Sequence, residues 1–410
     1  MSEEIHNDIR YIAKVFLEDL HKFYHYPLFR YLQKNSDLLK TFSGFLLNPS
    51  KLIIYIGKTH IAVEYVGVET IEKINNPSYK IELYDYSDSD IDFVEKIIGF
   101  KYDSTVELQM PLLSGLNENY LLPTNKGFDK LMELQWNFHA QDFSMLVMNA
   151  SAPTILKDKF SRIVNGFFFD ADELGLKTRH IKWLDFIPIT VDESDSEVVK
   201  VTFNISYMKS FIEHDATYIY PLPNDYKFKQ LPKINRFIEI WGNKNISEPE
   251  ITNFLSQKEN KFILTMKFGA TDSHAELTCK WQSEERDDIR PDFFIVQPNG
   301  YADIVEFKLP HISKNFIVGR NNRESFSSWL NSYISQTRVY VSYFDDPNNR
   351  KWFEEKYGFK VHKPKRWLVV GRRYDFSSDI WREIVADYRD LEIITFDDLL
   401  DGVVVQFYQD

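Results

Sequence analysis

RPDFFIVQPNGYADIVEFKLP, residues 290–310, is the stretch that decides the fold of this chain. Two runs rich in β-branched and aromatic residues flank the turn formers Pro298, Asn299 and Gly300, which predicts a β-hairpin. The first run opens with a proline and an aspartate, and the second ends with a glutamate, an apolar residue and a lysine. Two interpretations are open: a metal-dependent nuclease centre, or a solvated hairpin that happens to carry three charges.

The register of the hairpin decides whether the three charges meet. Glu306 and Lys308 are two residues apart in a strand, so they project from the same face. With a three-residue loop, in which Pro opens a type I turn and Gly is left-handed, Gln297 pairs with Tyr301. This pairing places Asp292 opposite Glu306, with Cβ atoms ~5 Å apart. With a two-residue loop Asp292 would lie opposite Phe307 instead, and the two acids could not form one site.

The chemistry of phosphodiester hydrolysis matches these residue types. It needs an activated water and a cation that takes up charge on the phosphate oxygens, and carboxylates that hold Mg²⁺ or Mn²⁺ supply both. Asp292 and Glu306 are the candidate ligands, and Lys308 is placed to orient or deprotonate the water. The bare motif is common, but two directly opposed carboxylates are destabilising unless a positive charge lies between them. That cost favours a metal site over a solvated hairpin.

A helix expected from about 323 to 344 supports the same interpretation. Gln336 and Tyr340 are four residues apart and share one helical face with Trp329 and Tyr333. Alone, this row is typical of an aromatic core stripe. A glutamine and a tyrosine one turn apart, after an acid-x-lysine strand, resemble the arrangement of RecB-type nucleases, and this resemblance implies that the glutamine faces the active site.

The organisation along the chain predicts an α/β fold in two domains. The helix PKINRFIEIW (232–241) is interrupted by GNKN, and SEPEITNFL then begins a new helix. We therefore expect a mixed α/β region of regulatory or sensing type at 1–242, as one or two subdomains. The catalytic domain is expected at 243–410, where strands alternate with helices after the hairpin in a mixed sheet flanked by helices.

The amino-terminal half shows mixed patterns without a chemical motif. Residues 3–34 have helical spacing, and 51–67 are typical of two strands about a tight turn. No constellation of catalytic residues precedes residue 235, so this half indicates no activity.

Composition excludes several classes of protein. The chain has 410 residues, 43% of them apolar, which is enough for more than one hydrophobic core. Its single cysteine, Cys279, excludes an internal disulfide framework and a cysteine-rich zinc site, which fits a reducing compartment. No apolar run nears the ~20 residues of a membrane span. We expect a soluble cytoplasmic protein with no membrane partner.

The net charge of −12 hides an asymmetry. Residues 308–373 hold 14 Lys and Arg against 5 Asp and Glu, so this segment is basic within an acidic chain. Because duplex DNA is a dense polyanion, the segment is a candidate docking surface. An ordinary solvated face is the alternative.

The order of these features resembles a known family. The segments SEPEITNFLSQKENKFIL, RPDFFIV, VEFKLP, SQTRVYVSY and RWLVVGRR are similar to the nuclease domain of the Shedu antiphage-defence proteins. These proteins are a branch of the PD-(D/E)xK nuclease superfamily, with a restriction-endonuclease-like fold, and the resemblance covers roughly residues 243–400. It implies a Mg²⁺- or Mn²⁺-dependent DNA endonuclease that acts on phage or plasmid DNA as a homo-oligomer, a dimer or tetramer.

The resemblance also implies roles for individual residues. By position, Asp292 and Glu306 would bind metal, and Lys308 would be the catalytic lysine. Gln336 would line the active site in the RecB-like arrangement, with Tyr340 beside it.

Further candidates come from the first helix and from the basic segment. Superfamily members often add a carboxylate from the first helix, for which Glu248 or Glu250 is the candidate, although Glu250 is equally explained as a capping-box residue. Arg372 and Arg373 follow a strand and a glycine and, with Arg338, are candidate contacts to DNA phosphate. A structural salt bridge is the alternative for the adjacent pair.

Two rival functions remain open from sequence. One is a nucleic-acid-binding or assembly protein whose nuclease fold has lost its activity, and intact Asp292, Glu306 and Lys308 argue against it. The other is a ribonuclease, because a metal-held water can attack either backbone.

Overall fold

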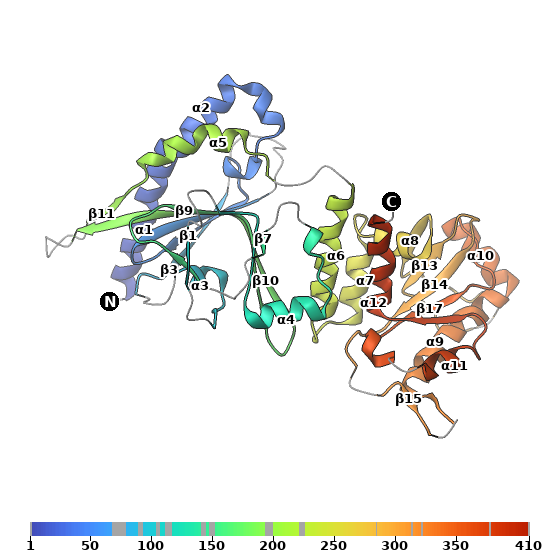
Figure 1. Cartoon of the computed structure of the whole chain (residues 1–410). Coiled ribbons are helices and arrows are strands. Elements are labelled where there is room, and N and C mark those ends of the chain that lie inside the picture. The colour runs from blue at the N-terminus through green and yellow to red at the C-terminus, as the bar shows by residue number, and fades with distance from the viewer. Residues whose placement is uncertain are drawn as a thin grey trace. The chain divides into compact units, whose positions relative to one another are not determined.

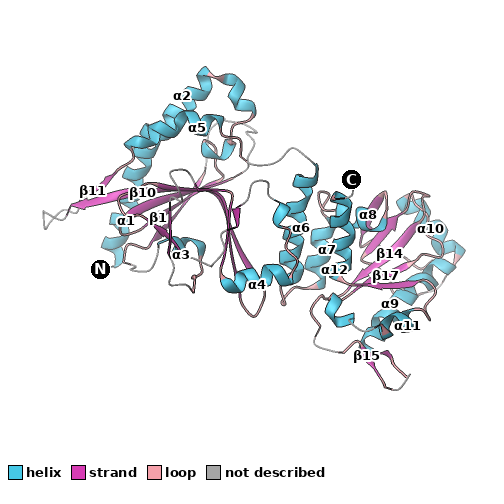
Figure 2. Cartoon of the chain, in the orientation of Figure 1, coloured by secondary structure: helices cyan, strands magenta, loops and turns pink. Residues whose placement is uncertain are grey.

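The computed structural model describes residues 2–67, 79–88, 93–103, 107–110, 117–140, 145–146, 152–192, 200–220, 226–283, 285–312, 315–320, 323–376 and 379–408. Helices and mixed sheets alternate along the chain, which confirms the predicted α/β class (Figure 2). The chain divides into two compact units, Met1–Lys229 and Gln230–Asp410. Among the residues described, no helix is long and apolar enough to cross a membrane.

Unit 1 is built on a nine-stranded mixed sheet with the order β3-β1-β2-β10-β9-β6-β7, where β11 pairs with β10 and β5 with β9. A separate parallel pair joins β4 to β8. Its helices are α1 (Ser2–Leu20), α2 (Tyr26–Lys34), α3 (Phe93–Ile98), α4 (Asn125–Glu133) and α5 (Ile212–Thr217), with π-helical His21–His25 between α1 and α2 and 3₁₀ turns at Ser36–Lys40, Gly44–Leu46, Phe138–Ala140 and Ser206–Phe211. Its strands are β1 (Lys51–Ile56), β2 (His60–Val66), β3 (Lys80–Asp85), β4 (Glu107–Met110), β5 (Asn117–Glu118), β6 (Tyr120–Pro123), β7 (Met145–Leu146), β8 (Ala152–Ile155), β9 (Ser161–Ala171), β10 (Leu176–Asp192) and β11 (Lys200–Phe203).

Both faces of the unit 1 sheet are covered, which explains the continuous apolar run of β1. Leu52 and Ile54 belong to a core shared with α1 and α2, whereas Ile53 and Tyr55 belong to a core shared with α3. A strand buried on both sides needs apolar residues at successive positions, not at alternate ones. The predicted hairpin at 51–67 is confirmed as β1 and β2, which pair antiparallel.

Two half-buried histidines make the stability of unit 1 depend on pH. Burial lowers the pKa of His25 and of His180 to about 3 in each case. An unfolded histidine titrates near 6.5, so between these values the unfolded chain binds more protons than the folded one. The stabilisation is therefore complete above pH ~6.5 and is lost as the pH falls, by about 2 kcal/mol per histidine near pH 5.

Urea unfolding near pH 5 and near pH 7 measures this loss. We expect the loss to shrink by about 2 kcal/mol in His180→Gln and to keep its wild-type size in His362→Gln, which replaces an exposed histidine. An equal loss in wild type and both variants would contradict the assignment.

Unit 2 contains a five-stranded mixed sheet with the order β12-β13-β14-β17-β18 (Figure 1). Strand β13 pairs antiparallel with both β12 and β14, whereas β17 pairs parallel with both β14 and β18. Its helices are α6 (Tyr226–Gly242), α7 (Glu248–Ser256), α8 (Phe262–Phe268), α9 (Ser328–Asp345), α10 (Pro347–Tyr357), α11 (Ile380–Val385) and α12 (Phe396–Val404), with 3₁₀ turns at Arg373–Phe376 and Val405–Phe407. Its strands are β12 (Asp272–Ala275), β13 (Phe293–Val296), β14 (Ala302–Phe307), β15 (Ile317–Val318), β16 (Ser325–Phe326), β17 (Arg366–Val369) and β18 (Leu391–Ile394).

The break predicted near residue 243 coincides with the end of α6, whereas the structure divides the chain within that helix. The later turns of α6 pack into unit 2. The Phe237 ring lies 5.4 Å from that of Phe254, and the Trp241 ring lies 6.0 Å from that of Phe396. These aromatic contacts attach the helix to unit 2, and a break inferred from local sequence does not reveal them.

Candidate active site

The turn between β13 and β14 has the predicted register. The last ladder pair joins Val296 to Ala302, and the backbone N–H of Gln297 donates to the carbonyl of Tyr301 at 2.8 Å. Gly300 has φ +80°, the left-handed conformation that favours glycine. The three-residue loop is therefore confirmed.

This register brings the two carboxylates together. Asp292 directly precedes β13, and Phe293 pairs with Val305, so the next position sets Asp292 opposite Glu306. The Asp292 carboxylate accepts a hydrogen bond from the backbone N–H of Phe307 at 2.7 Å. Glu306 is 2% exposed, so its charge is almost entirely removed from water. Two acids thus share one buried edge of the hairpin.

Lys308 lies on the same face as the acids. Its Nζ donates to Glu306 Oε1 and to Glu248 Oε2, both at 3.1 Å, and the residue is 5% exposed. The ammonium also lies 4.9 Å from the centroid of the Tyr333 ring. Between the two strand residues, Phe307 points the other way and packs 5.7 Å from Phe293, as the strand alternation predicts.

Helix α9 turns the predicted glutamine and tyrosine toward Glu306. Gln336 Nε2 donates to Glu306 Oε1 at 2.8 Å and to the Tyr340 hydroxyl at 2.9 Å. The Tyr340 hydroxyl in turn donates to Glu306 Oε2 at 3.1 Å. Each oxygen of this carboxylate therefore has a donor from α9, which fixes its orientation. Tyr333 on the same stripe contacts Lys308 instead, a role that its sequence position did not reveal.

The two acids of the cluster are buried beside too little positive charge to keep their pKa values low. Burial raises the pKa of Asp292 to about 7, and the neighbouring charge of Glu306 adds to the rise. Burial also raises the pKa of Glu306, although the ammonium of Lys308 opposes it. Burial lowers the pKa of Lys308, but the charges of Glu306 and Glu248 outweigh burial, so its pKa is raised overall. Lys308 is accordingly an ammonium at neutral pH.

The two acids at the start of α7 have different places. Glu250 accepts hydrogen bonds from the backbone N–H of Ser247 at 3.0 Å and from its hydroxyl at 2.6 Å. These bonds occupy Glu250 as the capping-box residue that its spacing predicts. Glu248 instead reaches Lys308, so it is the carboxylate of α7 that faces the site.

Arg372 and Arg373, the two adjacent arginines, form structural salt bridges. Arg372 is 2% exposed, donates to Asp397 at 2.9 Å and lies 4.5 Å from the Trp241 ring. Because its guanidinium is buried, the expected contact to DNA phosphate is corrected to a salt bridge. Arg373 pairs with two acids of α12, Asp398 and Asp401. The pair thus attaches α12 to the end of β17.

Arg338 remains a candidate contact to DNA phosphate. It is exposed on α9 and donates to the Ser335 hydroxyl at 2.7 Å. The role remains a prediction.

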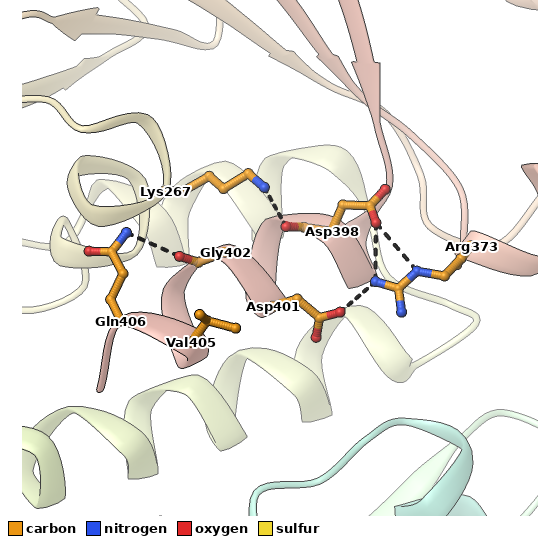
Figure 3. Close-up of a pocket in the computed structure, with 7 residues that line it drawn as sticks. All are labelled: Lys267, Arg373, Asp398, Asp401, Gly402, Val405 and Gln406. Atoms are coloured by element: carbon orange, nitrogen blue, oxygen red, sulfur yellow. Dashed lines mark hydrogen bonds and ion pairs between the residues drawn. The ribbon is translucent and has the colours of Figure 1, made fainter. Parts of the chain in front are cut away.

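An open pocket of about 690 Å³ lies elsewhere in unit 2 (Figure 3). It is lined by Lys267, Arg373, Asp398, Asp401, Gly402, Val405 and Gln406. Its polar groups serve the structure: Lys267 Nζ donates to the carbonyl of Asp398 at 2.5 Å, and Gln406 Nε2 donates to that of Gly402 at 3.1 Å. None of the residues of the predicted active site lines it. This pocket is therefore separate from the cluster of Asp292, Glu306 and Lys308 at the hairpin.

The donor set of the hairpin fits a hard divalent cation. In the described part of the chain, no three His, Cys, Asp or Glu side chains converge as a metal cluster, and Asp292 and Glu306 remain a pair. Mg²⁺ is commonly held by one or two carboxylates and completes its shell with water and substrate phosphate. A cation between these acids would relieve the repulsion that raises the pKa of Asp292. The pair is consistent with such a shared ion.

Fold and site together define a class: an α/β domain in which a β-hairpin gathers two carboxylates and a lysine beneath a glutamine-bearing helix. Residues 245–400 match the family model described as Shedu protein SduA, C-terminal. Over this segment the chain is similar to the Shedu carboxy-terminal domain, which confirms the resemblance that the sequence motifs indicated. No curated protein matches the chain.

Proposed function

We propose that the chain is a metal-dependent DNA endonuclease that acts on phage DNA in the cytoplasm as a homo-oligomer. The observation that carries the nuclease proposal is the hairpin register, which sets Asp292 opposite Glu306 with Lys308 on the same face. The Shedu domain match supports defence as the setting.

The residues of the site divide the work. Asp292 and Glu306 would hold Mg²⁺ or Mn²⁺. When bound, such an ion lowers the pKa of a water molecule and offsets negative charge on the phosphate. Lys308 carries a positive charge, so it is suited to stabilise negative charge on the phosphate in the transition state and less suited to take a proton from water. Gln336 and Tyr340 hold the Glu306 carboxylate in one orientation.

Incubation of the purified chain with supercoiled plasmid, linear duplex and RNA tests the proposal. The reactions contain Mg²⁺, Mn²⁺ or EDTA. We expect cleavage of DNA with either metal and none in EDTA. Cleavage of RNA alone would identify a ribonuclease. Binding of DNA without cleavage, in protein that is folded and carries metal, would support the rival function of a nucleic-acid-binding protein.

Glu248 and Glu250 provide a matched pair of substitutions. Glu248 contacts Lys308, whereas the contacts of Glu250 among the described residues are to the cap residue Ser247. Glu248→Ala should therefore lower the cleavage rate by about 10-fold or more. Glu250→Ala should weaken the start of α7 and leave the rate near that of wild type. Rates on plasmid and thermal unfolding of the same preparations separate the two effects. Equal rates in the two variants would contradict the assignment of Glu248.

A further inference from the structure

Along the chain, a short β-ribbon lies between β14, which carries Glu306, and α9, which contacts this acid. Ile317 pairs with Phe326 and Val318 with Ser325, which makes β15 and β16 antiparallel. The ribbon projects away from the five-stranded sheet of unit 2 (Figure 1). The predicted helix from about 323 is thus corrected: its first residues lie in this ribbon, and α9 begins at Ser328.

The base of the ribbon is anchored to the active site by aromatic rings. Phe316 is 4% exposed and its ring lies 5.6 Å from that of Trp329. Trp329 lies 4.7 Å from Tyr333, over which the Lys308 ammonium sits at 4.9 Å. Phe326, on the partner strand, is also buried. The ribbon therefore starts from a rigid base close to the proposed catalytic lysine.

The tip of the ribbon presents two arginines. Gly319 has φ +103°, and a Cβ there would lie 2.3 Å from the carbonyl oxygen of Arg323, so only glycine allows the two backbones this approach. Arg320 and Arg323 are exposed, and neither has an ion pair or hydrogen bond within the described part of the chain. Glu324, half-buried beside them, is the one acid of the described ribbon.

These arginines contrast with the pair that the sequence first indicated. Arg372 and Arg373 are held by acids of α12, whereas Arg320 and Arg323 face solvent in the basic segment 308–373. A guanidinium without an internal partner is the group that backbone phosphates recruit. A two-stranded ribbon also fits the major groove of duplex DNA, which is ~12 Å wide.

We propose that the β15–β16 ribbon is a contact for duplex DNA: it lies along a groove next to the cleavage site, and Arg320 and Arg323 bind backbone phosphates. This inference rests on the proposed nuclease function and deepens it, since it assigns a surface that positions the substrate. The contact to phosphate is independent of base sequence.

The salt dependence of duplex binding tests the ribbon. The full-length chain carries Lys308→Ala so that a fluorescent duplex stays intact in Mg²⁺, and its affinity is measured from about 50 to 200 mM salt. Each phosphate contact adds about 0.9 to the slope of log affinity against log salt, so Arg320→Gln with Arg323→Gln should flatten the slope by about 1.8 and weaken binding at least about 10-fold. The charge-conserving Arg320→Lys with Arg323→Lys should keep most of the slope.

Two controls keep the outcomes separate. Lys258→Gln with Lys280→Gln removes two exposed charges of unit 2 that lie outside the segment 308–373 and should leave the slope unchanged. If the arginine-to-glutamine variant keeps the slope and affinity of its parent while the wild-type chain cuts plasmid, the ribbon inference is overturned and the nuclease proposal stands. If the wild-type chain neither binds nor cuts DNA, the nuclease proposal fails, and the ribbon inference fails because it rests on that proposal.

Discussion

Lys308→Ala is expected to lower the rate of metal-dependent DNA cleavage by about 10²–10⁴-fold. The ammonium lies 3.1 Å from a carboxylate oxygen of Glu306 and is 5% exposed, so water does not readily replace its charge. Nicking and linearisation of plasmid in Mg²⁺, followed over time, measure the loss.

The control for this substitution is Lys351→Ala, which removes an exposed lysine whose ion pair, within the part of the chain that the structure describes, is with Glu355 on α10. It should cleave at the wild-type rate. Loss of Lys308 also leaves Glu306 and Glu248 without their shared cation, so some loss of thermal stability is expected. Cleavage at more than about a tenth of the wild-type rate by folded Lys308→Ala would remove the lysine from the mechanism.

Asp292→Asn and Glu306→Gln are expected to reduce cleavage by at least about 10²-fold each. Each amide keeps the shape of the acid but lacks the charge that a hard cation requires. In Asp292→Asn the change also ends the repulsion between the two carboxyls, so this variant without metal should be no less stable than wild type near pH 8.

Thermal unfolding with and without Mg²⁺ or Mn²⁺ supplies a second readout for these variants. Metal that binds only the folded state raises the midpoint of wild type by mass action. The rise should vanish in Asp292→Asn and Glu306→Gln and persist in Asp272→Asn, which alters a half-buried acid of β12 that pairs with Lys261. A full metal-induced rise in all of these proteins would place the cation elsewhere.

The local parts of the site were predictable because local chemistry fixes them. The Pro-Asn-Gly turn sets the hairpin register, and the register alone brings Asp292 to Glu306. Helical spacing places Gln336 and Tyr340 on one face, and the structure turns that face to Glu306. In both cases a few neighbouring residues determine the geometry.

The alternatives that the sequence left open depend on residues far apart in the chain. Arg372 looked like a phosphate contact because its partner, Asp397, belongs to a later helix. Glu248 and Glu250 are both acids in one helical turn, and only the packing of α7 beside β14 shows which one meets Lys308.

Local sequence patterns also could not predict the shortest strands or the order of strands in a sheet. The strands of the ribbon have two residues each, too few for a hydrophobic period to be visible. The strand order of unit 1 brings β10 between β2 and β9, a pairing that no nearby residue specifies.

The location of Mn²⁺ in crystals of the intact chain tests the central claim most directly. Anomalous scattering marks the position of the ion without reference to activity. We predict a peak between the carboxylates of Asp292 and Glu306 that disappears in Asp292→Asn. A peak at another site and none at this pair, in protein that cleaves DNA with Mn²⁺, would contradict the assignment.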